Sequence, residues 1–401
     1  MNISQQLDSF KENEQWRSLK NIDRQHHGKI KKDGTLLDSF ISNDYLGIAS
    51  DQDRYFSFLN TLQDSNHFNG FGAASSRLLE GNASAFEYFE QKVAAAFHKE
   101  ACLFMNSGYH ANIGILSSIP QKGDLILSDK LNHASIVDGL KLSNAHFERY
   151  KHLDYSHLER LLLKNKDKFN SIFIVSEALF SMDGDTADLK VLSQLKEKYN
   201  AHLIIDEAHS IGTFGKSGLG ICEENDVLNK VDIIVAPCGK ALGGVGALVV
   251  LSQEWKDFLI NTSRSFIYTT SLPPINVEWL TYNWQYILNQ SKLRNSLFQL
   301  VTYFKKACKK RNLPVLSDTY IQPILVGDNE TAVSLANYLE SEGIYCAPIR
   351  YPTVPKNTAR LRLSITVNHT EALIDQVLDL ISDYLHTKKT EHENTLVKEG
   401  R

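Results

Sequence analysis

The feature that most constrains the fold is a regular recurrence of short apolar runs in the middle of the chain. The runs "SIFIVS", "AHLIID" and "VDIIVA" begin at Ser171, Ala201 and Val231, and residues with helical patterning separate them. A strand, a crossover helix and a second parallel strand together need about thirty residues or more. The spacing therefore predicts an α/β fold built on a mainly parallel, doubly wound sheet.

Other apolar runs extend this sheet and suggest where it ends. "ACLFMNSG" and "DLILSD" predict two further strands, and "ALVVLS" predicts one that runs antiparallel. We expect an N-terminal segment over 1–44 and a large domain over 45–275. After "SLPP" the pattern changes to one typical of a smaller α+β domain, expected over 276–386, and the polar tail 387–401 is expected to lack regular structure.

Composition excludes several classes of protein. The formal net charge of the 401 residues is -4 with both signs mixed along the chain, so we expect neither nucleic acid nor a membrane as a partner. The N-terminus lacks a signal-peptide pattern, which favours a cytoplasmic location. The five cysteines are scattered without a C-x-x-C motif, so we expect neither disulfides nor a metal site.

Polar residues stand where three of the predicted strands end. Asp206 ends one strand and His209 follows it, Glu177 ends another with Ser181 in the loop beyond, and Lys240 follows the third in "APCGKALGG". Ligands of open parallel sheets bind at the carboxyl ends of the strands. Each residue alone would be an ordinary helix cap or a solvated charge, but their convergence on one edge predicts a site.

Two nucleotide-binding interpretations of these segments fail. "DEAH" at 206–209 matches a helicase box and "GKS" at 215–217 resembles the end of a P-loop, but position 210 is serine where a P-loop needs glycine. The supposed phosphate loop also follows the supposed magnesium strand without an intervening helix and strand. "GFGAAS" at Gly70 lacks the third glycine of a dinucleotide-binding fingerprint.

A lysine and an acidic side chain at one sheet edge, without metal ligands, suit pyridoxal 5'-phosphate (PLP). A lysine amine can form a Schiff base with an aldehyde cofactor, and PLP then serves as an electron sink. A carboxylate such as that of Asp206 keeps the pyridine nitrogen protonated. The start of a helix in "NSGYHAN" offers the backbone N–H groups of Gly108 and Tyr109 to the phosphate.

The chain resembles the α-oxoamine synthases, which are PLP enzymes of fold type I, from Ser42 to the "ARLRLSIT" segment at Ala359. The resemblance is carried by these motifs in order: "SNDYLG", "GFGAASSRLLEGN", "MNSGYHAN", "LNHASIVDG", "SEALFSMDGD", "IIDEAHSIGTFGKSGLG", "GKALGG" and "FIYTTSLPP". It implies a homodimer with shared active sites.

The resemblance also implies roles for single residues. Lys240 would hold the cofactor and act as the base, with His133 stacked over the pyridine ring and Asp206 at its nitrogen. The remaining expected cofactor contacts are Ser181 and His209 near the ring oxygen, Gly108 and Tyr109 at the phosphate, and Thr270 reaching the phosphate from the other subunit. The expected substrate contacts are Arg362 at the amino acid's carboxylate, with Arg17 and Thr353 at the acyl group.

The chain departs from the family pattern at two positions. Pro237, three residues before the lysine, can supply neither the hydroxyl nor the N–H that a serine or threonine would offer the phosphate. Phe86 stands where the family often has histidine, and we assign it to packing.

"IQPILVGDNETA" and "IRYPTVPKNTARLRL" resemble the biotin-pathway branch of the family. That branch condenses L-alanine with a pimeloyl thioester, pimeloyl-CoA or pimeloyl acyl carrier protein, and releases carbon dioxide to form 8-amino-7-oxononanoate. Two alternatives stay open. One is another branch of the family, such as the 2-amino-3-ketobutyrate CoA ligases, and the other is a non-catalytic PLP-binding regulator, against which the lack of a helix-turn-helix pattern before the sheet counts.

Overall fold

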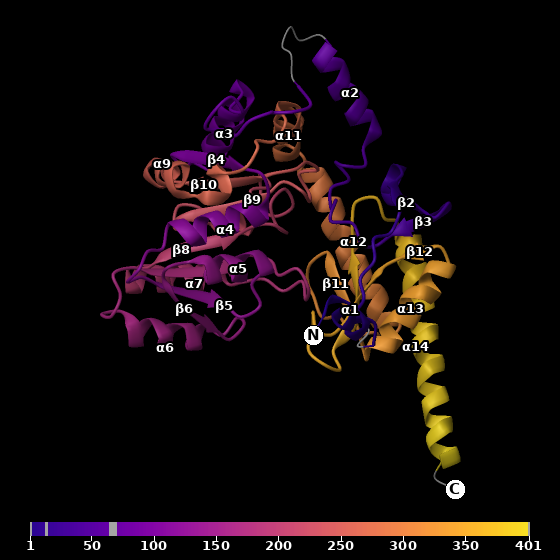
Figure 1. Ribbon diagram of the computed structural model, residues 1–401. Helices are drawn as coiled ribbons and strands as arrows, with labels where there is room; N and C mark the ends of the chain where they lie inside the picture. Colours follow the sequence, from indigo (N-terminus) through magenta and orange to yellow (C-terminus); the bar gives the residue numbers. More distant parts are fainter. Residues whose placement is uncertain (1, 13–14, 64–69, 400–401) are drawn as a thin grey trace. The chain divides into compact units, whose positions relative to one another are not determined.

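The computed structural model describes residues 2–12, 15–63 and 70–399, and these divide into two compact units (Figure 1). The sheet unit comprises Asn43–Ser181 and Asp185–Asn295. The smaller unit comprises Met1–Ser42, Met182–Gly184 and Ser296–Arg401. The chain therefore enters the smaller unit for three residues at Met182–Gly184 and returns at Asp185.

The sheet unit is built on a seven-stranded sheet of order β4-β10-β9-β8-β7-β5-β6. Its strands are β4 Ala101–Met105, β5 Leu125–Asp129, β6 His146–Tyr150, β7 Ile172–Glu177, β8 His202–Asp206, β9 Ile233–Pro237 and β10 Ala247–Leu251. Only β10 runs against the others, being antiparallel to both β4 and β9, while the neighbours from β9 to β6 pair in parallel. The predicted α/β fold class is confirmed.

Helices cover both faces of this sheet because its central strands are apolar on both sides. The helices of the sheet unit, not all of which lie on the sheet, are α2 Gln52–Gln63, α3 Ser84–Ala96, α4 Gly108–Ser118, α5 Ala134–Leu142, α6 Tyr155–Asn165, α7 Leu189–Tyr199, α8 Ile221–Glu224, α9 Gln253–Thr262, α10 Arg264–Ile267 and α11 Pro274–Leu288. In β4, Leu103 and Met105 join the core cluster that contains Ile115 of α4. Phe104 points to the other face and packs against Phe86 of α3, as expected from the two-residue period of a strand. The assignment of Phe86 to packing is confirmed.

The smaller unit holds two sheets. Strands β1 Ile22–Arg24, β2 Lys29–Lys32, β3 Thr35–Ser39 and β12 Ile344–Tyr345 form one, in the order β1-β2-β3-β12. Strands β11 Ile321–Gly327, β14 Ala359–Ser364 and β13 Ala347–Ile349 form the other, antiparallel and in the order β11-β14-β13. The helices are α1 Ile3–Glu12, the short 3-10 helix η1 His26–Gly28, α12 Ser291–Lys310, which begins in the sheet unit, α13 Asn329–Ser341 and α14 Glu371–Glu399.

The division of the chain differs from the predicted boundaries. The N-terminal segment belongs with the C-terminal region, because β3 pairs in parallel with β12, Asp38 lying opposite Ile344. The boundary near residue 276 moves to Ser296, because α11 packs on α3 within the sheet unit. The tail expected to lack structure is helical as far as Glu399. Its lysines and glutamates are good helix formers, which apolar periodicity alone does not report.

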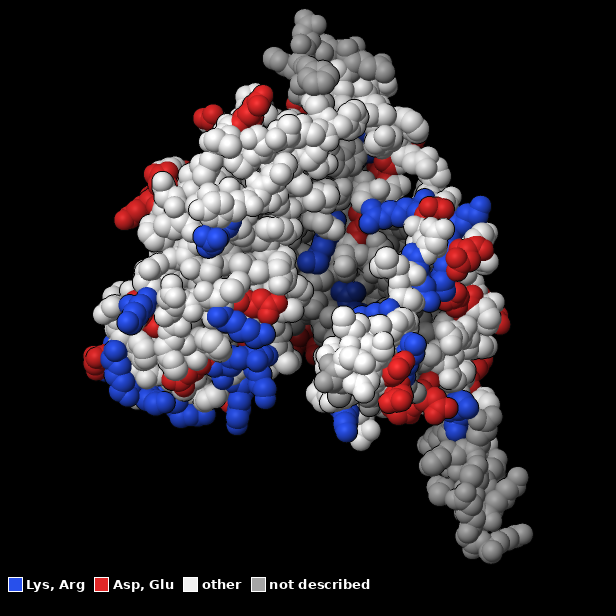
Figure 2. Space-filling view, in the orientation of Figure 1, with Lys and Arg blue, Asp and Glu red and all other residues white. Residues whose placement is uncertain are grey.

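Charge and hydropathy on the described residues are unremarkable apart from one basic area. No helix among them is both long and apolar enough to cross a membrane. Lys and Arg side chains gather over α6 and the residues after it (Figure 2). The exposed cations of this segment are Arg160, Lys164, Lys166 and Lys168. All five cysteines are free and buried, as the sequence indicated.

Candidate active site

The parallel register of the sheet brings the predicted polar residues to one edge. Glu177 at the end of β7 lies opposite Asp206 at the end of β8, and Asp206 lies opposite Val235 of β9. Lys240 follows three residues after β9 ends at Pro237. The charges of both Asp206 and Lys240 act on the pKa values of His133 and Glu177, so these groups share one neighbourhood.

Asp206 presents a buried and oriented carboxylate. It is 4% exposed, and each of its oxygens accepts a hydrogen bond. Oδ2 accepts from Asn112 Nδ2 at 2.8 Å, and Oδ1 accepts from the N–H of Ala208 at 2.8 Å. Asn112 is in turn held by Ser135, 2.9 Å away. These hydrogen bonds hold the Asp206 carboxylate in one orientation without help from solvent, as an ion pair with a pyridinium requires.

His133 is the N-cap of α5, and its imidazole is fixed by local bonds. Nδ1 accepts the N–H of Ser135 at 3.2 Å, and the main-chain N–H of His133 donates to Glu177 Oε1 at 2.6 Å. Burial lowers the pKa of His133, and Lys240 lowers it further, against the opposing effect of Asp206. The ring is thus neutral at physiological pH, which suits stacking on an aromatic cofactor.

Glu177 is a buried carboxyl that the sequence singled out without a role. Burial and the charge of Asp206 raise its pKa well above the usual value. The two carboxyls are register partners at the ends of β7 and β8, so a neutral Glu177 relieves the repulsion between them. Its bond to the main chain of His133 makes it a support for that histidine.

His209 and Ser181 also lie in the sheet unit. His209 is buried, and its Nδ1 lies 2.7 Å from the hydroxyl of Tyr45, which donates to Asn43. Ser181 is half-buried at the last position before the chain enters the smaller unit. Tyr45 belongs to the "SNDYLG" motif, and the sequence did not predict its hydrogen bond with His209.

The start of α4 forms the predicted phosphate-side loop. Ser107 caps the helix by accepting from the N–H of His110. The N–H groups of Gly108 and Tyr109 lie in the same first turn, where backbone N–H groups have no acceptor within the helix. A side chain at Gly108 would meet Pro237, because a Cβ there would lie 2.6 Å from Cγ of the proline. The Tyr109 side chain is exposed and donates to Asp138, so only its backbone N–H is a candidate for binding the phosphate.

Thr270, which is expected to reach the phosphate of the other subunit, lies in a segment that is bonded to the end of β4. It is exposed, and its carbonyl accepts from Asn106 Nδ2 at 2.7 Å. The hydroxyl of Thr269 accepts from the same amide at 3.1 Å. These bonds tie the "YTTS" segment to the end of β4 within one chain, and Asn106 is a site-region residue that the sequence did not single out.

The arginines of β14 belong to the smaller unit. Arg360 and Arg362 are two residues apart in β14 and therefore share one face of the strand. Arg360 forms an ion pair with Asp183, and Arg362 donates to Ser364 Oγ at 3.0 Å. Asp183 therefore compensates the charge of Arg360, and Arg362 is a buried guanidinium on the same face that stays a candidate for a substrate carboxylate.

Arg17 and Thr353, which the sequence placed at the acyl group, line one pocket of the smaller unit. Its volume is about 620 Å³. Its lining comes from α1, the segment after it, the end of β13 and the segment that follows β13: Leu7, Phe10, Gln15, Trp16, Arg17, Pro348, Ile349, Arg350, Tyr351, Pro352 and Thr353. The walls are mainly apolar and carry two guanidinium groups, so the pocket suits an aliphatic chain with an anionic end.

The residues that suggested nucleotide binding have structural roles. Glu207 is fully buried and accepts from the N–H groups of Ile221 and Cys222 at the start of α8. Glu223 accepts from the N–H groups of Ser217 and Leu219. Carboxylates therefore occupy the donors of the glycine-rich loop, so a phosphate could not bind there.

The donor set of the sheet edge fits PLP. It combines an amine at Lys240, a buried carboxylate at Asp206, a neutral imidazole at His133 and a helix N-terminus at Gly108. Gly239 leaves space beside the lysine, because the nearest atom to a Cβ built there is Gly244 O at 3.8 Å. The chemistry that PLP supplies when bound is the withdrawal of electrons from an amino acid's Cα.

Comparison with known proteins identifies the class. The aminotransferase class I and II family matches residues 42–381, and the chain belongs to this family of PLP-dependent enzymes. Within it, the resemblance to the α-oxoamine synthases is confirmed. A curated relative from Neisseria meningitidis, named "Putative 8-amino-7-oxononanoate synthase", is 45% identical over 92% of this chain and 97% of its own.

Solved structures agree with this class. The 8-amino-7-oxononanoate synthase from Francisella tularensis has a TM-score of 0.75 at 32% identity, covering 88% of this chain and 99% of that one. A structure of serine palmitoyltransferase with PLP has a TM-score of 0.88 at 26% identity, covering 96% and 99%. The fold type and the cofactor predicted from the sequence are thereby confirmed.

Proposed function

We propose that the protein condenses L-alanine with a pimeloyl thioester to give 8-amino-7-oxononanoate, carbon dioxide and the free thiol. The observation that carries this proposal is the 45% identity, over nearly the full length of both chains, to relatives named for that synthase. The pocket that holds Arg17, Arg350 and Thr353 supports it. A pimeloyl group is an aliphatic chain that ends in a carboxylate, which matches apolar walls with two guanidinium groups.

Each proposed role follows from the chemistry of a side chain. Lys240 Nζ would hold the cofactor and then take the proton from the Cα of alanine, since a strand end aims it rigidly. Asp206 would hold the proton on the pyridine nitrogen, and its burial strengthens that interaction. His133 would stack over the ring in the neutral state that its lowered pKa maintains.

The phosphate and the remaining ring contacts are assigned to backbone and hydroxyl groups. The N–H groups of Gly108 and Tyr109 would bind the phosphate at the start of α4, because a helix N-terminus favours anions. His209 and Ser181 would lie at the ring oxygen. Since Pro237 has no donor, more of the phosphate's binding depends on α4.

Substrate contacts come from the smaller unit. Arg362 would bind the carboxylate of alanine through its planar guanidinium. Arg17 and Thr353 would bind the acyl group, and the pocket adds Arg350 as a second cation. We also propose that two chains form a homodimer in which Thr270 of one chain serves the other's phosphate, and that the protein works in the cytoplasm.

The function is tested with purified protein and PLP. L-Alanine with pimeloyl-CoA or with pimeloyl acyl carrier protein should release thiol and yield 8-amino-7-oxononanoate by mass spectrometry. Comparing the two donors shows which carrier is used. Turnover of glycine with acetyl-CoA, or of L-serine with palmitoyl-CoA, without turnover of L-alanine would assign the protein to another branch. PLP binding with no turnover of any pair would favour a regulator.

A further inference from the structure

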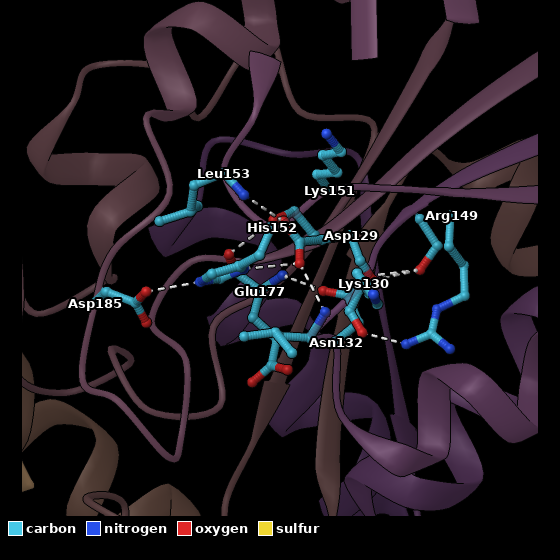
Figure 3. A network of polar contacts seen from close by, with 12 residues as sticks. Asp129, Lys130, Asn132, Arg149, Lys151, His152, Leu153, Glu177 and Asp185 are labelled. Atoms are coloured by element: carbon cyan, nitrogen blue, oxygen red, sulfur yellow. Dashed lines mark hydrogen bonds and ion pairs between the residues drawn. The ribbon is translucent and has the colours of Figure 1, made fainter. Parts of the chain in front are cut away.

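His152 forms an unusual bridge between two carboxylates at the edge of the sheet unit. Its Nδ1 lies 2.8 Å from Asp129 Oδ1 and its Nε2 lies 2.6 Å from Asp185 Oδ2, as Figure 3 shows. The imidazole also packs edge-on against Phe180, with ring centroids 4.5 Å apart. Both nitrogens of a protonated imidazole donate, so the cationic form satisfies both carboxylates at once.

Asp129 is a rigid anchor for this bridge. It ends β5, is fully buried, and accepts from the N–H of Leu131 at 2.8 Å and from the N–H of Leu153 at 3.0 Å. Those bonds fix both carboxylate oxygens to the chain on either side of the site (Figure 3). His152 is therefore attached at one end to an immobile part of the sheet.

Asp185 is the variable end of the bridge. Its Oδ1 is buried and has no hydrogen-bond partner among the described residues, so the carboxylate depends on His152 for its charge compensation. Asp185 is also the residue at which the chain re-enters the sheet unit. Removing the cation would leave a partly buried charge without compensation at that point.

The segment that Asp185 terminates is a tight hairpin carrying two residues of interest. Its arms pair through Phe180 N–H to Asp185 O at 2.9 Å and through the bridge between Leu179 and Thr186. Ser181 stands at one side of the tip. Asp183 stands within the tip and pairs with Arg360, the neighbour of Arg362 on the same face of β14.

We propose that His152 is a positioning residue that, by bridging Asp129 and Asp185, holds the 181–185 hairpin in the arrangement that binds the cofactor. The proposal rests on the proposed function only in assigning Ser181 to the cofactor. The mechanism is electrostatic: a cation between two carboxylates fixes the direction of the hairpin more firmly than a neutral side chain of the same size.

The charge state of His152 agrees with this geometry. Burial alone would lower its pKa, but hydrogen bonds to Asp129 and Asp185 outweigh burial and raise the pKa to about 9. Tyr155 of α6 also lies near both carboxylates, and burial raises its pKa to about 12. On the same segment as His152, Asp154 caps α6 by accepting from His157 N–H. The bridge is thus charged at neutral pH and loses its proton near pH 9.

The test compares His152→Gln and Asp185→Asn with wild type, and uses His146→Gln as the control. His146 is an exposed histidine of neighbouring β6 that stacks on Phe169 and touches neither carboxylate. The readout is the dissociation constant of PLP from apo-protein, measured by absorbance from pH 7 to 10. We expect His152→Gln to weaken PLP binding about fivefold at pH 7. Asp185→Asn should weaken it less, and His146→Gln should leave it unchanged.

The pH dependence separates positioning from simple structural damage. The ratio of the variant's dissociation constant to that of wild type should shrink above about pH 9, where wild type also loses the imidazolium. Titrations shared by both proteins cancel in this ratio. A ratio that stays constant from pH 7 to 10, or PLP affinity equal to wild type at pH 7, would overturn the proposal.

A second measurement addresses the bridge itself. In apo-protein with ¹³C-labelled histidine, the imidazole of His152 should titrate near 9, and Asp185→Asn should lower that pKa. Titration near the ordinary value of 6.5 would contradict the bridge. Neither readout uses the acyl substrates, so a failure to turn over L-alanine would leave this result interpretable.

Discussion

The strand-end site of the sheet unit and the pocket around Arg17 in the smaller unit are held together in different ways. In the strand-end site, Asp206 and Glu177 accept hydrogen bonds from residues far away in sequence, and both are nearly fully buried. The pocket is lined by α1, which buries none of its own residues, by the end of the short strand β13 and by irregular segments at Arg17 and after Ile349.

This difference suggests that the strand-end site and the pocket serve different purposes. Groups at strand ends keep their geometry because the sheet and its long-range bonds define it, which suits chemistry common to a family. Irregular segments can change sequence without disturbing the sheet, which suits the choice of acyl substrate. Substitutions in the first region should therefore abolish chemistry or cofactor binding, and those in the second should change substrate preference alone.

The largest expected effect is at Lys240. Lys240→Ala should lower turnover by at least about 10³-fold, because it removes both the amine that holds the cofactor and the proposed base. Absorbance spectra of the purified protein with PLP should lose the visible band of the lysine-bound cofactor. A variant that keeps wild-type spectrum and turnover would remove Lys240 from the site.

The next effect tests how tightly the phosphate-side loop is packed. Gly108→Ala would place a Cβ 2.6 Å from Pro237 Cγ, so α4 or the proline must shift. Overpacking of this kind costs about 1–3 kcal/mol, and we expect PLP affinity to fall about tenfold. Gly72→Ala is the matched control, since a Cβ there meets nothing within 4 Å. Equal affinities of the two variants would show that this contact does not matter.

The pocket should give an effect of similar size that is more selective, because it concerns the acyl donor alone. Arg17→Ala should raise the KM for the pimeloyl thioester about tenfold, the cost of one charge-assisted hydrogen bond, without changing PLP affinity. Heptanoyl-CoA, which lacks the terminal carboxylate, should show no such loss in the variant. Arg24→Ala, an exposed arginine of β1, is the control. A comparable loss with both acyl donors would place the carboxylate elsewhere.

The last prediction concerns how the stability of the folded protein depends on pH, which is expected to differ between the two units. Burial lowers the pKa of His369 in the smaller unit to about 4 and outweighs the opposing effect of its bond to Ser39 O; the ring also stacks on Phe40. The unfolded chain binds a proton near pH 6.5, so the free energy of unfolding should fall by up to about 1.4 kcal/mol per pH unit between 6.5 and 4. His152 acts oppositely, losing its contribution as pH rises from 6.5 through about 9.

Urea denaturation at pH 4.5, 5.5 and 6.5 measures this dependence. His369→Gln should flatten the acid side of the profile even if it lowers stability at every pH, and His146→Gln should leave the slope as in wild type. An unchanged slope in His369→Gln would show that another group causes the acid dependence.

Much of the sheet unit could be predicted because parallel strands impose a simple geometry. The apolar runs became β7, β8 and β9, and their carboxyl ends bring Glu177, Asp206 and the Lys240 loop to one edge. The antiparallel β10 was also expected and is confirmed. Motif order further indicated the family and the cofactor.

The sequence did not predict other features, because they depend on contacts between residues that lie far apart in the chain. The support of Asp206 by Asn112 and the bridge from Asp129 through His152 to Asp185 join residues on different elements. The polar composition of the tail concealed its helix, and the pairing of β3 with β12 moved the N-terminal segment into the smaller unit.

The sequence by itself determined which backbone pattern forms and which reactive side chains follow its strands, because periodicity and residue type are local properties. Only the tertiary structure decided how those side chains are held: which carboxyl has a raised pKa, which imidazole is neutral and which is a cation. The reason is that burial and the nearest opposite charge set these states, and both come from residues that folding alone brings into contact.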